Sequence, residues 1–105
     1  MQLSRETAQF PKTVEEAVGR LIADLPLRDK VQIANLRQDE LIYLHFSLGM
    51  GIRNLFGLWA GNGELLKPCS LLAGVNHIHP DDGSAVIITE LWKRLRETHA
   101  LRAVK

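Results

Sequence analysis

The chain has 105 residues, of which 46% are hydrophobic and 24% charged; this suits one folded domain and excludes an intrinsically disordered chain. Thirteen Lys and Arg against twelve Asp and Glu leave a formal charge of +1, so no strong overall field attracts nucleic acid or an anionic membrane. The lone cysteine, Cys69, excludes an internal disulfide and a thiolate zinc cage, and it fits a reducing compartment, so we expect a cytoplasmic protein.

The first two predicted elements are helices separated by a proline. Thr13 and Glu16 have the spacing of a capping box, and apolar residues then recur at helical intervals until Pro26 stops the pattern. A shorter amphipathic pattern predicts a second helix over 27–36. We expect residues 1–10, ahead of the first helix, to form a flexible N-terminus.

A long apolar stretch dominates the middle of the chain. From Leu41 to Gly63 only Arg53 is charged, and four of the six aromatic side chains fall in this stretch. Polar residues and glycines interrupt it, so it lacks the run of about 20 apolar residues that a membrane span needs. The pattern therefore predicts a buried central helix over about 39–56, around which the core is organised.

The remaining chain predicts one short helix and one long one. Residues 64–67 form a single helical turn that Pro68 ends, and residues 70–78 show no regular pattern. A proline followed by two aspartates opens the last predicted helix, over about 80–97, because carboxylates stabilise the positive end of a helix. We expect residues 98–105 to be a frayed, basic C-terminus.

Together these patterns predict an all-α fold, with residues 1–105 forming one compact domain, a bundle of about five helices. Several sequence blocks have a specific joint spacing: PKTVEEA (11–17), LHFSLGMGIRN (44–54), FGLW (56–59) and HPDD (79–82). In these blocks the chain resembles an uncharacterised family of small bacterial proteins, a domain of unknown function. The resemblance implies a compact, stand-alone helical domain and supplies no activity.

Arg53, the single charged residue between Leu41 and Gly63, is the first candidate for a binding residue. With His45 and Gly49 it forms an i, i+4 row in which the glycine leaves a notch. Either the backbone of another helix crosses at this notch or a ligand enters it, and we favour the helix crossing. Arg53 in turn either pairs with an acid of the chain or binds an anion, and we favour the internal pair. The candidate acids are Asp81, Asp82 and Glu64.

A second polar cluster, residues 76–82, contains two histidines and two aspartates. Imidazole and carboxylate suit divalent metals, but a helix N-terminus capped by His79 also explains the cluster, and we expect no metal and no cofactor. If the loop folds back toward the central helix, a general acid/base or metal constellation arises. Its members would be His45, Arg53, His77, His79 and Asp81.

For function we expect a non-enzymatic module that binds another protein or a second copy of itself as a homodimer. This rests on surplus apolar residues around Trp59, whose replacement by a charged residue should abolish association and leave helicity intact. We expect no membrane partner, and nucleic acid is not an expected partner because the basic residues after Lys93 lack a recognition motif. The alternative is a small enzyme or ligand-binding domain that uses the His/Arg/Asp constellation on an anionic small molecule. The candidate binding residues are Arg53, Asn54, Trp59, Asn62, Leu65 and Leu66, and the surplus apolar residues are Leu58, Trp59, Leu65, Leu66, Leu71 and Leu72.

Overall fold

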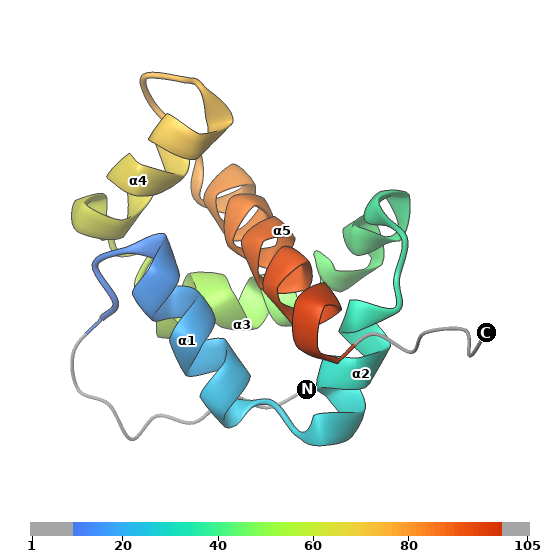
Figure 1. Cartoon of the computed structure of the whole chain (residues 1–105). Coiled ribbons are helices and arrows are strands. Elements are labelled where there is room, and N and C mark those ends of the chain that lie inside the picture. The colour runs from blue at the N-terminus through green and yellow to red at the C-terminus, as the bar shows by residue number, and fades with distance from the viewer. Residues whose placement is uncertain (1–9, 100–105) are drawn as a thin grey trace.

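The computed structural model describes residues 10–99, which form six helices and no strand (Figure 1). The all-α prediction is confirmed, with one helix more than expected. Most of the predicted flexible N-terminus and frayed C-terminus, 1–10 and 98–105, lies outside the described residues. None of the six helices is long and apolar enough to cross a membrane. They are α1 (Val14–Asp24), α2 (Leu27–Ala34), the 3₁₀ helix η1 (Gln38–Leu44), α3 (Leu48–Leu55), α4 (Gly63–Ala73) and α5 (Pro80–Thr98).

The last helix, α5, lies at the centre of the fold (Figure 1). It packs against each of the other five helices. Its residues Ile87, Leu91 and Leu95 are completely buried. The indole Nε1 of Trp92 donates to the carbonyl of Leu36 at 2.8 Å, which fastens the chain after α2 to α5. The prediction that a helix over 39–56 organises the core is therefore wrong, because α5 has that role.

The predicted central helix is broken into η1 and α3 by a turn at residues 45–47. In a continuous α-helix the His45 carbonyl would accept from the amide of Gly49. Here Nη2 of Arg53 donates to that carbonyl at 3.4 Å instead. Ser47 and Gly49 are weak helix formers, so the break sacrifices little helical stability. Part of the segment predicted to be buried is consequently exposed: Ile42, Tyr43, Phe46 and Met50.

Helix α4 is longer than predicted because Pro68 lies inside it. An interior proline lacks an amide donor and disfavours a helix by about 3 kcal/mol. Leu65 and Cys69, one helical turn apart, are both completely buried, and their packing offsets this penalty. The helix ends instead at Gly74, whose φ of 73° is the left-handed conformation typical of helix C-termini. The predicted stop at Pro68 is therefore wrong, because the helix continues to Ala73. The irregular chain predicted over 70–78 is limited to residues 74–78.

Helix ends set by local capping residues fall where the sequence predicts them. The Oγ1 of Thr13 caps α1 by accepting from the amide of Glu16 at 3.0 Å. The Glu16 carboxylate accepts from the amide of Lys12, at 3.4 Å, rather than from Thr13 itself. The Nδ1 of His79 caps α5 by accepting from the amide of Asp81 at 3.1 Å. In both caps a side chain accepts from a backbone amide of the first turn, which has no carbonyl partner within the helix.

Two glycines after α3 offer a matched test of packing. Gly57 has a φ of 71°, and a Cβ there would lie 2.5 Å from Cε2 of Phe10. Gly61 has a φ of 81° with open space around it. We expect Gly57→Ala to lower the free energy of unfolding by about 2 kcal/mol and Gly61→Ala by about 1 kcal/mol, measured by urea denaturation. Equal losses would show that the Phe10 ring does not pack on Gly57.

Cys69 offers a test of burial at α4. Desolvation raises the pKa of its thiol from an ordinary value of 9.0 to about 11. Since the thiolate is the reactive form, a disulfide reagent at pH 8 should modify the folded protein about a hundredfold more slowly than the urea-unfolded chain. The unfolded thiol ionises first, so stability should fall as pH rises from about 9 toward 11, and more than in Cys69→Ala. Equal reaction rates would contradict the burial.

Candidate functional site

Arg53 lies at the centre of a buried polar cluster that joins α3 to the N-terminus of α5. Its exposed fraction is 5%. Nη1 donates to Oγ of Ser84 at 2.9 Å, and Nη2 donates to the carbonyl of His45. Nε lies 3.4 Å from Oδ1 of Asp81, a charge contact in which Nε makes no hydrogen bond. The predicted pairing of Arg53 with an acid of the chain is confirmed, and the acid is Asp81.

The notch at Gly49 is filled from within the molecule. A Cβ on Gly49 would lie 3.1 Å from Nη1 of Arg53 and 3.6 Å from Cδ1 of Ile88. The side chains of Arg53 and of Ile88 in α5 thus occupy the space, so the notch is filled by packing, but by side chains and not by the predicted crossing of a helix backbone. The predicted row of three residues is shorter than expected, because His45 lies in the turn before α3.

Two partly exposed rings cover the outer side of the Arg53 cluster. Cζ of Arg53 lies 5.9 Å from the centroid of the Trp59 ring, a distance at which a cation is attracted to the indole. His79 meets the same indole edge to face, with 5.7 Å between the centroids. Nδ1 of His79, which caps α5, lies 3.8 Å from Oδ2 of Asp81. These contacts hold α3 against the start of α5, so the cluster acts as a structural joint, although Nε of Arg53 is left without a hydrogen bond.

The structure does not assemble the predicted acid/base constellation. His45 lines a cavity of about 300 Å³ between η1 and α5, whereas His77 lines a separate cavity of about 400 Å³ beside α4. Of the five side chains, those of Arg53, His79 and Asp81 meet in the cluster described above, to which His45 contributes its backbone carbonyl and not its imidazole. Within residues 10–99, no three His, Cys, Asp or Glu side chains are placed to hold a metal ion together.

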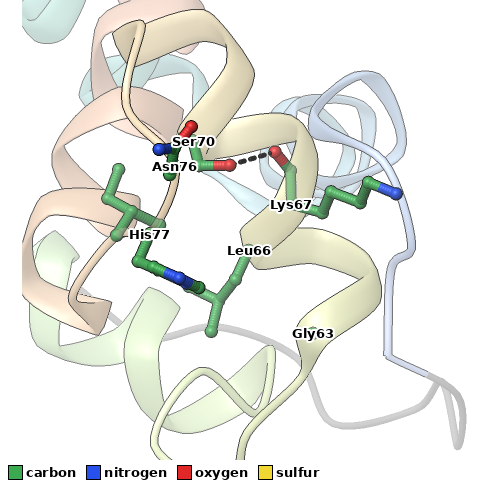
Figure 2. A pocket seen from close by; sticks show the side chains of 7 residues that line it. Gly63, Leu66, Lys67, Ser70, Asn76 and His77 are labelled. Carbon is green, nitrogen blue, oxygen red and sulfur yellow. Dashed lines mark hydrogen bonds between the residues drawn. The ribbon is translucent and has the colours of Figure 1, made fainter.

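The cavity beside His77 lies between α4 and the loop that follows it (Figure 2). His77 lies near Leu66 in this view, and Asn76 lies near Ser70. The hydroxyl of Ser70 is engaged, since it donates to the carbonyl of Lys67 at 2.6 Å. The ammonium group of Lys67 extends away from His77. The cavity therefore presents an imidazole and an amide, with the nearby cation turned outward.

The stretch from the end of η1 through the turn into the start of α3 carries the two most exposed large apolar side chains of residues 10–99. The exposed fractions are 69% for Ile42, 74% for Tyr43, 79% for Phe46 and 51% for Met50. We call these four side chains the 42–50 surface. Single exposed apolar residues are ordinary, but a group of them within nine residues is typical of an interaction site.

Sequence reasoning missed the 42–50 surface because it treated the whole stretch as core. A signal was present in the spacing. Leu41, Leu48 and Ile52 recur on one helical face and are buried. Ile42 and Phe46, with Met50 one turn further on, follow a second row at intervals of four. One amphipathic segment cannot turn both rows toward the same core, so one of them reaches the surface.

The predicted binding residues divide into core, cap and surface. Leu65 is completely buried, which corrects its prediction as a surface residue. Asn62 caps α4: its Oδ1 accepts from the amide of Leu65 at 3.4 Å, and its Nδ2 donates to the carbonyls of Phe56 at 2.8 Å and Pro11 at 3.1 Å. Of the other candidates, Asn54, Trp59, Leu71 and Leu72 are exposed, Leu66 is partly buried, and Leu58 belongs to the core.

Comparison with known proteins gives a family and nothing further. No curated protein and no solved structure matches the chain. The family described as Domain of unknown function (DUF6794) matches residues 10–95, which include the four blocks that carry the resemblance. This chain therefore belongs to the DUF6794 family, a domain of unknown function as the resemblance predicts.

Proposed function

We propose that this protein is a small helical module that binds another protein molecule through the 42–50 surface. The observation that carries the proposal is the exposure of four large apolar side chains on one short segment. Burying such a side chain completely gains about 1.5–3 kcal/mol, so four that are about two-thirds exposed supply roughly 4–8 kcal/mol before the entropy of association is subtracted. That gain is large enough to drive specific binding once flanking contacts add to it.

The backbone that carries the 42–50 surface is held at two points, which reduces the entropy lost on binding. At its centre the ring of His45 meets Phe46 edge to face with 5.5 Å between centroids, and the His45 backbone is held by Arg53. At the start of η1 the amide of Arg37 donates to Glu40 at 2.8 Å, and the Arg37 side chain pairs with Asp39 at 3.2 Å. A preorganised apolar surface of this kind supports a binding role.

The experiment compares matched charge substitutions at two exposed apolar positions. Phe46→Glu alters the 42–50 surface, while Leu71→Glu alters an equally exposed side chain at the far end of α4. We expect a stoichiometric partner to be captured from a cell lysate by the wild type and by Leu71→Glu, and lost with Phe46→Glu at unchanged helicity and melting temperature. Capture by Phe46→Glu would contradict the proposal.

Trp59→Glu adds a third arm to this experiment. Trp59 lies over the Arg53 cluster, outside the 42–50 surface, and is about half exposed. We expect this variant to retain the partner. Loss of the partner with Trp59→Glu alone would show that the partner binds around Trp59, over the Arg53 cluster. That is the binding surface predicted from the sequence.

A second candidate function, binding of a small ligand, is supported by the cavity beside His77. At about 400 Å³ it lies within the size range of ligand sites, and the polar residues of its lining are Lys67, Ser70, Asn76 and His77. A ligand that binds only the folded state raises the melting temperature by mass action. Thermal melts with EDTA, zinc, manganese or phosphate, repeated with His77→Ala, test it. A rise in melting temperature that His77→Ala abolishes supports the site. If the melting temperature stays the same with every additive, these ligands do not bind.

A further inference from the structure

The 42–50 surface has a cavity beside its projecting side chains. This cavity of about 300 Å³ lies between η1 and the N-terminal half of α5. Leu41 and Ile88, both buried, are apolar members of its lining. His45, Asp82 and Thr89 contribute polar groups to the same lining. Ile42 belongs to both features and Tyr43 follows it directly in the chain, so the cavity borders the 42–50 surface.

We infer that the partner of the 42–50 surface is a second copy of this chain, bound so that Tyr43 of each copy enters the cavity of the other. This inference rests on the proposed function and names its partner. A two-fold symmetric interface requires each copy to carry both halves of the contact on one face. The projecting Tyr43 and the cavity that adjoins Ile42 meet this requirement.

The cavity suits a tyrosine in both size and chemistry. A cavity of about 150 Å³ suffices to bind benzene, so one of about 300 Å³ has room for a phenol ring. A buried tyrosine hydroxyl needs a hydrogen-bond acceptor. The carboxylate of Asp82 is exposed and forms no ion pair within residues 10–99, so it is available to accept from the hydroxyl of Tyr43.

The exposed area is also sufficient for a dimer of ordinary size. A standard interface buries about 800 Å² on each partner, of which somewhat more than half is apolar. Tyr43 and Phe46 together offer about 300 Å², since an aromatic side chain carries roughly 150–250 Å² and both are about three-quarters exposed. With Ile42 and Met50 the surface reaches about 400 Å², which is most of the apolar part of such an interface.

The first test is the mass of the protein in solution, measured by sedimentation equilibrium. We expect the wild type to dimerise reversibly. Tyr43→Phe removes only the hydroxyl, so the dissociation constant should rise about ten- to a hundredfold, as for loss of a hydrogen bond to a charged group. Leu71→Glu, outside the interface, should leave the dissociation constant unchanged.

A complementation experiment tests the geometry. Tyr43→Ala removes the projecting ring and keeps the cavity, whereas Ala85→Trp fills the cavity and keeps the ring; both positions are exposed, so both variants should fold. Each variant alone should be monomeric at concentrations where the wild type is dimeric. Their equimolar mixture should form a heterodimer, because the tyrosine of one variant can enter the cavity of the other.

Two results would overturn the inference, and they differ from failure of the proposed function. A wild type that stays monomeric at millimolar concentration excludes the second copy as partner, and the lysate experiment with Phe46→Glu then decides whether the surface binds a different protein. A wild-type dimer that Tyr43→Ala and Ala85→Trp both leave intact would show that dimerisation uses another face.

Discussion

Arg53→Ala is expected to lower the free energy of unfolding by about 3–4 kcal/mol. The substitution removes two hydrogen bonds from a buried guanidinium, to Ser84 and to the His45 carbonyl, and bonds of this charged type contribute about 1.5–3 kcal/mol each. It also leaves a void where the aliphatic part of the arginine side chain packs. Part of the loss is offset, because the folded variant no longer buries a charge. Urea denaturation and thermal melts measure the effect, which for a domain of this size corresponds to roughly 12–25 °C in melting temperature.

Two further variants test the same joint. Arg53→Lys keeps the charge and loses the two-pronged donor geometry, so it should be intermediate in stability. Asp81→Asn should cost less than about 1 kcal/mol, because the Asp81 side chain is 43% exposed and solvent screens its charge contact with Arg53. An Arg53→Ala protein as stable as the wild type would show that Arg53 is not a structural joint.

Asn62→Ala is expected to lower the free energy of unfolding by about 3 kcal/mol. Asn62 makes three hydrogen bonds with three parts of the chain, to the amide of Leu65 and to the carbonyls of Phe56 and Pro11. A lost helix cap is worth about 1 kcal/mol, and each of the two other bonds about as much again. Chemical denaturation checks the size of the loss, and circular dichroism checks that the folded variant keeps its helices.

Asn62→Ser serves as the control for the cap. Serine can still cap α4, but it is too short to reach both carbonyls, so it should recover about 1 kcal/mol of the loss. If Asn62→Ala retained full stability and lost partner binding instead, Asn62 would be a surface contact, as the sequence-based list of binding residues has it.

The parts of the fold that were predictable from sequence depend on a few neighbouring residues. Thr13 and His79 cap helices because their side chains reach amides two or three residues ahead, and no distant contact is needed. The pairing of Arg53 with an acid was also predictable, because a charge isolated in an apolar stretch requires a counter-charge when buried. The His45 carbonyl as a further partner was not predictable, since any backbone carbonyl can accept.

The choice of the core helix was not predictable from local composition. The stretch over 39–56 is the more apolar one, but it carries apolar residues on two faces, and only tertiary packing decides which face is covered. α5 alternates buried residues such as Leu91 with charged ones such as Lys93, and it still contacts every other helix. The prediction that a helix ends at Pro68 failed for the same reason, because the burial of Leu65 and Cys69 outweighs the local penalty of a proline.

The most direct test of the central claim, that the 42–50 surface is the binding surface, is an NMR titration of the ¹⁵N-labelled chain with unlabelled chain. Shift changes should concentrate on residues 41–50 and on 82–89, the part of α5 that lines the adjoining cavity. The amides around Leu71 and Leu72, which are equally apolar and exposed, should stay unchanged. Changes centred on Leu71 and Leu72, with none over residues 41–50, would contradict the claim.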